Sequence, residues 1–346
     1  MSSVKETLCR LSEINAVSGN EKSICETLAE MLKEYSESVY IKNNCVFADF
    51  GAEKGEKPHV LIDAHLDQIG MIVTYIEKDG FLRVGNVGGL DRRLLPAQQV
   101  TIHGKKDIKG VIASIPPHLS SDSKVLEMDE VLIDTGYSKK ELEEIVSLGD
   151  VVSFDVKAVQ LTETRVTGKS LDDRAGITAI FRMLDRLRGE KLPCRLTVMF
   201  SSQEETNESG ATTGAFLINP DVAIAVDVSF AMSEGEDPKK CGVMGKGAMI
   251  GFAPVLDRDT SLEFKKLAET RNIPYQIEVM GRSTGTNADR FSINRCGAKA
   301  CTISIPLKYM HTPVEIIDVN DIENTAELLA AYVLEGEKNI DIPYYS

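Results

Sequence analysis

Four short apolar segments, each followed by carboxylate or imidazole side chains, constrain the fold of this chain most. The segments span residues 60–62, 196–200, 222–226 and 301–305. Runs of this length and branching are typical of strands buried on both faces of a parallel sheet. Ligands in open α/β sheets bind beyond the carboxyl ends of the strands, so the polar residues that follow these segments are expected to meet at one place.

The polar residues after these segments, together with one acidic pair before a predicted helix, are of the types that bind divalent metals. Zinc-like ions favour imidazole and carboxylate ligands. Two such ions held close together can polarise a carbonyl group and lower the pKa of a bound water. Each residue alone is more typical of a helix cap or a surface pair, but the whole pattern predicts a hydrolytic site with two metal ions. In chain order the residues are His65 and Asp67, Asp172 and Asp173, Glu204 and Glu205, Asp227, and His311.

Position suggests individual roles. Residues two apart in a strand face the same side, so Asp67 is expected to hold the free ring nitrogen of His65. Asp172 lies just before a predicted helix, where negative charge is favourable, and it is our choice for the carboxylate that bridges the metals. Glu204 and Glu205 are adjacent and cannot play identical roles. One is expected to bind a metal and the other to take a proton from the attacking water.

The patterning of the chain indicates two domains, as its 346 residues also favour. Residues 70–165 contain short alternating segments separated by turn signals, such as Asp79-Gly80 between two apolar runs. This pattern predicts a small β barrel or sandwich inserted into an α/β domain. The α/β pattern occupies residues 1–69 and 166–346, which form a discontinuous catalytic domain.

A helix is predicted from Ile24 to Tyr35, where apolar residues recur at helical spacing. Ser18 or Asn20 is expected to cap it. With Ser18 as the cap, Glu21 completes the spacing of a capping box.

Charge and hydropathy limit the kind of partner. The chain has 39 basic and 53 acidic residues, a net charge of −14, whereas nucleic-acid binding needs clustered lysine and arginine. No apolar run approaches the roughly 20 residues of a membrane span, and residues 1–7 lack the apolar core of a signal peptide. A cytoplasmic protein that binds neither membrane nor nucleic acid is therefore expected. The seven scattered cysteines contain no CxxC pair and are predicted to be reduced thiols.

The motifs around these residues resemble those of the glutamyl/deblocking aminopeptidases, metallopeptidase family 42. The resemblance covers essentially the whole chain, and the motifs taken together are highly specific. They are Ala64-His65-Leu66-Asp67, Leu171-Asp172-Asp173-Arg174-Ala175-Gly176, Gln203-Glu204-Glu205, Val226-Asp227-Val228, and the segment from Tyr309 to Glu315.

The resemblance implies a zinc-peptidase-like fold. The catalytic domain is expected to be a three-layer α/β/α structure with a mixed sheet, and the inserted β barrel is expected to mediate dimerisation. Relatives often assemble further into tetrahedral shells of twelve subunits, so a homo-oligomer is expected, as a dimer or a dodecamer. Some relatives carry a cellulase label.

The resemblance also implies an activity, the removal of N-terminal amino acids from peptides by two divalent metal ions. Zinc is the first expectation, with cobalt or manganese as alternatives. Asp172 is expected to bridge the metals, and its peptide bond to Asp173 is expected to be cis. Glu204 is expected to be the general base that acts on a metal-bridging water, with Asp67 as a further catalytic residue. The implied metal ligands are His65, Asp172, Glu205, Asp227 and His311.

Three departures from the family pattern stand out. Gln68 occupies a position where relatives typically have glutamate. Residues 206–210 read Thr-Asn-Glu-Ser-Gly in place of a Val-Gly-x-Arg-Gly pattern, and residues 284–288 read Thr-Gly-Thr-Asn-Ala in place of Gly-Gly-Thr-Asp-Ala. No expected metal ligand is lost. The departures are expected to line the pocket for the first residue of the substrate or its amine, and they leave the preferred residue open.

Three alternatives remain. The first is a deacylase or carboxypeptidase with the same metal site. The second is a glycosidase, but the absence of tryptophan and an aromatic content of 6% argue against sugar-binding platforms. Sugar hydrolysis by two carboxylates also needs no metal. The third is a non-catalytic peptide-binding scaffold, which the altered loops suggest and the intact Glu204 opposes.

Overall fold

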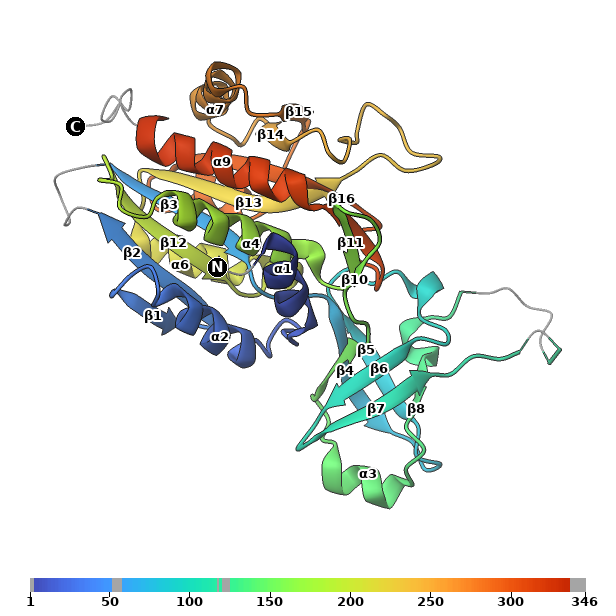
Figure 1. The fold of residues 1–346 in the computed structure, drawn as a ribbon. Helices are drawn as coiled ribbons and strands as arrows, with labels where there is room; N and C mark the ends of the chain where they lie inside the picture. Colours follow the sequence, from blue (N-terminus) through green and yellow to red (C-terminus); the bar gives the residue numbers. More distant parts are fainter. Residues whose placement is uncertain (1–2, 52–57, 117, 120–124, 337–346) are drawn as a thin grey trace.

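The computed structural model describes residues 3–51, 58–116, 118–119 and 125–336. Figure 1 shows a larger body of sheet and helices, from which a smaller β barrel projects at one end. The barrel is formed by the middle of the sequence, and the segments before and after it both belong to the larger body.

Within the described residues, an 11-stranded mixed sheet forms the centre of the larger body. Its strands are β1 (Val39–Lys42), β2 (Cys45–Gly51), β3 (His59–His65), β10 (Val159–Gln160), β11 (Arg165–Gly168), β12 (Arg195–Ser201), β13 (Val222–Phe230), β14 (Ala248–Phe252), β15 (Tyr275–Val279), β16 (Lys299–Lys308) and β17 (Glu315–Asp318). Strands β12, β3, β13 and β16 are neighbours in that order, and each adjacent pair is parallel. They contain the four apolar segments, so the prediction of buried parallel strands is confirmed.

Helices cover both faces of this sheet, which confirms the three-layer α/β/α architecture. They are α1 (Val4–Glu13), α2 (Lys22–Leu32), α4 (Leu171–Arg186), α5 (Glu204–Asn207), α6 (Ser209–Ile218), α7 (Arg258–Arg271), α8 (Ala288–Ser292) and α9 (Val319–Glu335). In β3, Val60 and Ile62 pack into the core formed with α2, α4 and α9, whereas Leu61 packs toward α6 and α8. Because successive strand residues face opposite sides, a strand covered on both faces is apolar throughout.

The projecting domain is a closed barrel, as predicted. Its strands are β4 (Gly70–Ile76), β5 (Leu82–Val87), β6 (Gln99–His103), β7 (Asp107–Ile112), β8 (Leu132–Asp134) and β9 (Val151–Phe154), which close in the order β4-β5-β8-β7-β6-β9. The turn at Asp79-Gly80 joins β4 to β5 as an antiparallel hairpin. Branched aliphatic side chains such as Val73, Ile102 and Ile133 fill the interior. One helix, α3 (Lys139–Ile145), and two short 3₁₀ turns, η1 (Arg92–Leu94) and η2 (Met128–Glu130), complete the domain.

The prediction of a helix from Ile24 to Tyr35 with a side-chain cap, which corresponds to α2, is wrong in its bounds and in its cap. The helix begins at Lys22, ends at Leu32 and has no side-chain cap. The Ser18 hydroxyl instead donates to Asp67 Oδ2 at 2.5 Å, and Glu21 Oε1 accepts the N–H of Gly19. The Ser18 side chain, which local spacing predicted as the helix cap, thus binds Asp67, a residue distant in sequence.

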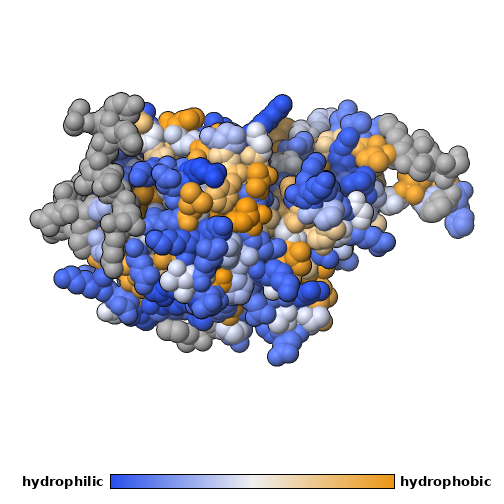
Figure 2. All heavy atoms as spheres, turned by 90° about the horizontal axis from the view of Figure 1, so that it is seen from above, coloured by the Kyte–Doolittle hydropathy of each residue, from blue (hydrophilic) through white to orange (hydrophobic). Residues whose placement is uncertain are grey.

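Polar side chains dominate the face of the molecule shown in Figure 2, and the apolar side chains on it lie in small patches. None of the helices that the structure describes is both long and apolar enough to cross a membrane.

Candidate metal centre

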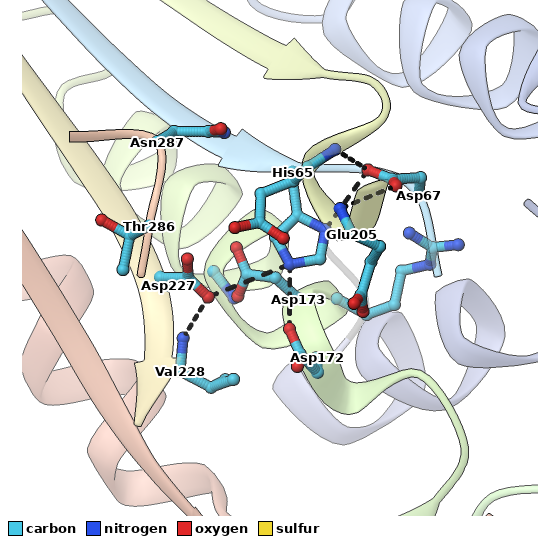
Figure 3. Close-up of polar contacts among 12 residues, drawn as sticks. His65, Asp67, Asp172, Asp173, Glu205, Asp227, Val228, Thr286 and Asn287 are labelled. Atoms are coloured by element: carbon cyan, nitrogen blue, oxygen red, sulfur yellow. Dashed lines mark hydrogen bonds and ion pairs between the residues drawn. The ribbon is translucent and has the colours of Figure 1, made fainter. Parts of the chain in front are cut away.

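The side chains singled out by the sequence converge at the carboxyl ends of the parallel strands. His65 is the last residue of β3, and Asp67 follows two residues later. Asp227 lies in the second half of β13, and Glu204 and Glu205 open α5 directly after β12. Figure 3 shows His65, Asp67, Glu205 and Asp227 around one small volume. The strand order brings together residues up to 162 positions apart.

The two remaining ligand candidates come from irregular backbone. Asp172 has non-helical dihedrals at the kinked start of α4, and its peptide bond to Asp173 is cis, as the resemblance implied. His311 follows β16 and has a φ of +62°. Neither conformation can be derived from the hydrophobic pattern, because Asp172 lies in the irregular backbone between β11 and the regular part of α4, and His311 lies in the loop between β16 and β17.

The carboxylate of Asp172 lies between two histidines. Its Oδ1 is 2.9 Å from Nε2 of His65, and its Oδ2 is 3.3 Å from Nε2 of His311. Nε2 of His311 is also 3.4 Å from Glu205 Oε2, and Nε2 of His65 is 3.9 Å from Asp227 Oδ1. Each oxygen of Asp172 therefore faces a different imidazole, and each imidazole has a second carboxylate near it. A carboxylate shared between two metal ions needs this arrangement.

Asp173, which belongs to the metal-binding pattern in the sequence but had no individual role there, is a further possible donor. It can join His65 and Asp227 in one group of possible metal ligands, while His65, Asp172 and Glu205 form a second group. Asp173 Oδ1 accepts the N–H of Gly176 at 2.8 Å, so one of its oxygens is committed to the start of α4. Its position beside Asp172 was the only signal in the sequence.

Asp67 forms hydrogen bonds with backbone N–H groups rather than with the ring of His65. Its carboxylate accepts the Ser18 hydroxyl and the N–H groups of Glu204 and Glu205, the last two at 3.0 and 3.2 Å. Nδ1 of His65 lies 3.5 Å from Asp67 Oδ1, which is too long for the expected hydrogen bond. The expectation assumed strand geometry, but β3 ends at His65. Asp67 therefore anchors the start of α5, and its charge still faces the imidazole.

Burial and mutual repulsion shift the acids of the cluster. Burial raises the pKa of Glu204 to about 7, and it also raises the pKa values of Glu205 and Asp227. Burial opposes ionisation of Asp172 too, but hydrogen bonds with the two histidines outweigh it and hold its pKa below the usual range. For His311, burial lowers the pKa, whereas the hydrogen bond to Asp172 and nearby carboxylates raise it to about 10.

These properties fit a pair of divalent cations. Buried carboxylates with raised pKa values lack compensating positive charge, which bound cations would supply. Among the described residues, Asp173 Oδ2 is buried beside His65 and Asp227 without a hydrogen-bond partner. The donors are imidazole nitrogens and carboxylate oxygens, the set that zinc-like ions prefer.

Two of the three departures from the family pattern are buried beside the site. Gln68 is 2% exposed, and its Oε1 accepts from Ser170 at 2.9 Å and from Lys169 at 3.3 Å. Lys169 is itself 5% exposed and donates to the carbonyl of Ser12 at 2.7 Å. The hydrogen-bond acceptors of this buried ammonium are therefore neutral groups.

The second buried departure is Asn287, which Figure 3 places beside Thr286 at the edge of the cluster. Its Nδ2 donates to Asp63 Oδ2 at 2.7 Å and to the Ser201 hydroxyl at 2.8 Å. Burial raises the pKa of Asp63 to about 7. Asn287 thus ties the loop before α8 to β3 and β12.

The third departure, residues 206–209, lies at the junction of α5 and α6. Glu208 there has a φ of +56° and pairs with Arg290 of α8, with 2.9 Å between Glu208 Oε2 and the Arg290 Nε. This departure is more exposed than the other two.

Comparisons with known proteins show the family to which the chain belongs. The model of the M42 glutamyl aminopeptidase family matches residues 44–328. A lysyl aminopeptidase of Pyrococcus furiosus is 34% identical over 345 residues, which cover 97% of this chain and 98% of that protein. An aminopeptidase of the archaeon Desulfurococcus kamchatkensis has a TM-score of 0.91 at 32% identity, covering 98% of this chain and 99% of that one. The TET1 peptidase of Pyrococcus horikoshii has a TM-score of 0.86 at 32% identity, covering 96% and 100%.

The fold and the histidine–carboxylate cluster define a metal-dependent hydrolase that acts on peptides. The chain belongs to the M42 glutamyl aminopeptidase family and is an aminopeptidase, which confirms the resemblance of its motifs.

Proposed function

We propose that this protein removes N-terminal amino acids from peptides with two divalent metal ions. The observation that carries the proposal is the carboxylate of Asp172, whose two oxygens face His65 and His311 at 2.9 and 3.3 Å. Asp172 would be shared by both ions. His65 and Asp227 would hold one ion, and His311 and Glu205 would hold the other. Zinc is the first choice for both ions, with cobalt or manganese as alternatives.

Two divalent ions bound there supply Lewis-acid polarisation of the scissile carbonyl and a water of lowered pKa. Glu204 is the general base. It takes the proton from the attacking water and returns it to the departing amine. In the absence of metal ions burial raises the pKa of Glu204 to about 7, and bound cations would favour its ionised form, which can accept a proton. Asp67 supports catalysis by fixing the backbone of Glu204 and Glu205.

The substrate is a peptide with a free amino terminus. The family name refers to glutamyl substrates, whereas the Pyrococcus furiosus relative is a lysyl aminopeptidase. Names therefore do not fix the preferred residue, and the experiment below includes both types.

The protein works as a homo-oligomer, with the β barrel as its dimerisation domain. Ile115 and Leu119, on the segment that leads away from β7, are 69% and 79% exposed. Figure 2 shows apolar side chains on the projecting part of the molecule as well. The TET1 relative can assemble into a tetrahedron or a larger shell, which supports higher assembly of this chain.

Hydrolysis of paired substrates tests this function. Lysyl, glutamyl and leucyl p-nitroanilides are compared with their N-acetyl forms, using metal-free protein and protein supplied with zinc, cobalt or manganese. We expect metal-dependent cleavage of the free-amine substrates only. Cleavage of N-acyl amino acids would replace the aminopeptidase by a deacylase. No cleavage by protein with two bound metals would favour a peptide-binding scaffold.

A further inference from the structure

The side chain of Glu315 joins the two loops that carry Asp172 and His311. Its Oε1 accepts the N–H of His311 at 2.9 Å. Its Oε2 accepts the N–H of Leu171 at 2.7 Å and that of Asp172 at 3.2 Å. Glu315 is 1% exposed, so water does not compete for these bonds. One carboxylate thus connects backbone segments about 140 residues apart in sequence.

Both loops contain backbone that needs support from outside. Ser170 has a φ of +57° and His311 a φ of +62°. Non-glycine residues rarely adopt this left-handed region, and they stay there when the surrounding structure holds them. Glu315 binds the N–H of His311 itself and the N–H of the residue that follows Ser170. Its hydrogen bonds therefore support the backbone at and next to the two residues with left-handed conformations, His311 and Ser170.

The sheet anchors Glu315. It is the first residue of β17, which pairs antiparallel with β11, and its Cα partner there is Gly168. The carboxylate thus extends from a fixed strand toward two loops that lack regular structure.

The hydrogen bonds of Glu315 also affect the positions of the proposed ligand side chains. Asp172 Oδ2 and His311 Nε2 lie 3.3 Å apart, and that spacing depends on the backbone positions that Glu315 fixes. Ligand groups that are held in place before metal binds lose less freedom on binding, which strengthens affinity.

We propose that Glu315 is a positioning residue, which sets the separation of the Asp172 and His311 loops and thereby the affinity of the metal pair. The assignment of the ligands rests on the function proposed above. The hydrogen bonds of Glu315 to the two loops, here called the clamp, exist in the metal-free protein. Their effect can therefore be measured without any substrate.

Two substitutions test the clamp by different routes. Glu315→Gln keeps the length of the side chain but replaces one acceptor oxygen with an NH₂ group that faces an N–H. Glu315→Asp keeps the charge but is one methylene too short to reach both loops. Zinc binding to chelator-treated protein is measured by calorimetry, and amide hydrogen exchange of residues 168–176 and 309–316 is followed by mass spectrometry. We expect zinc affinity to fall at least tenfold and exchange in both segments to become faster.

Asp321 provides a matched control. It is also fully buried, and its carboxylate accepts the N–H groups of Gly245 and Gly247 at 2.6 and 2.7 Å. Asp321→Asn should lower the thermal midpoint while leaving zinc affinity and exchange in the two loops unchanged. Wild-type zinc affinity and exchange in both folded Glu315 variants would overturn the proposal. If wild-type protein cleaves no peptide, the proposed function fails, but the exchange of the two loops still decides the role of Glu315.

Discussion

The carboxylate of Asp67 accepts the backbone N–H of Glu204, with 3.0 Å between Asp67 Oδ1 and the Glu204 nitrogen. Its other oxygen accepts the N–H of Glu205 and the hydroxyl of Ser18. One buried acid thus positions the residue proposed as the base and the residue proposed as its neighbouring metal ligand.

Asp67→Asn should lower kcat/KM roughly 10–100-fold, as loss of groups that support metal ligands commonly does. The new NH₂ group would face a backbone N–H at the start of α5, and the imidazole of His65 would lose a nearby negative charge. Steady-state kinetics with zinc-loaded protein measure the effect. Ser18→Ala removes one donor and keeps the carboxylate, so its loss should be smaller. Equal activity of Asp67→Asn and wild type would remove Asp67 from the catalytic assignment.

Glu204→Gln should retain two metals and lower kcat about 10²–10⁴-fold, the usual contribution of a general acid–base group. The amide has nearly the same shape but cannot accept the proton of the attacking water. Metal content by mass spectrometry and kcat are measured on the same preparation. Glu208→Gln is the matched control, because Glu208 lies on the same segment but pairs with Arg290. If Glu204→Gln keeps wild-type kcat, another group is the base.

Metal removal should destabilise the protein, because the buried carboxylates then repel one another without compensation. Zinc at about 100 times its dissociation constant should restore about 2.7 kcal/mol of unfolding free energy for each ion bound. Thermal unfolding after chelation and after re-addition of zinc measures the difference. Asp172→Ala, which removes the proposed bridge, should lose most of this gain. An identical midpoint with and without zinc in wild type would count against a metal site at this cluster.

The parts of the fold that follow from local pattern were predictable, including β3, β12, β13 and β16 and the ligand candidates after them. A strand buried on both faces leaves a run of apolar residues in the sequence. Because ligands bind beyond the carboxyl ends of such strands, polar residues directly after the run are candidates for the site. The bonds of Glu315 to Leu171 and His311 had no such signal, because they join loops of irregular backbone. The capping rule failed at Ser18 for a related reason, since Asp67 competes for the same hydroxyl.

Ile115→Asp combined with Leu119→Asp should reduce the mass of the assembly in light scattering. Apolar side chains with 69% and 79% exposure are costly in water unless a partner covers them, and a buried aspartate would disfavour the contact. Ile293→Asp is a control of the same type on the larger domain, where Ile293 is 70% exposed. An unchanged mass in the double variant would place the dimer contact elsewhere.

Lys169 should make stability rise with pH. Burial lowers its pKa to about 7, against an ordinary value of 10.5. Below pH 7 both states carry the charge and the folded state bears the full cost of burying it. Between pH 7 and about 10.5 the unfolded chain binds more protons than the native one, so the unfolding free energy increases, by up to about 1.4 kcal/mol per pH unit. Urea unfolding at pH 7, 8 and 9, compared with Lys169→Met, isolates this contribution.

The rise of the unfolding free energy with pH should be large because of Gln68, which gives Lys169 a neutral oxygen at 3.3 Å in place of a carboxylate. Gln68→Glu should raise the pKa of Lys169 and flatten the dependence on pH between 7 and 9, since an opposite charge favours the ammonium form. Lys22→Met, at a residue with an 86% exposed side chain, should leave the wild-type slope unchanged. A slope in Lys169→Met equal to that of wild type would show that Lys169 stays charged in the folded protein.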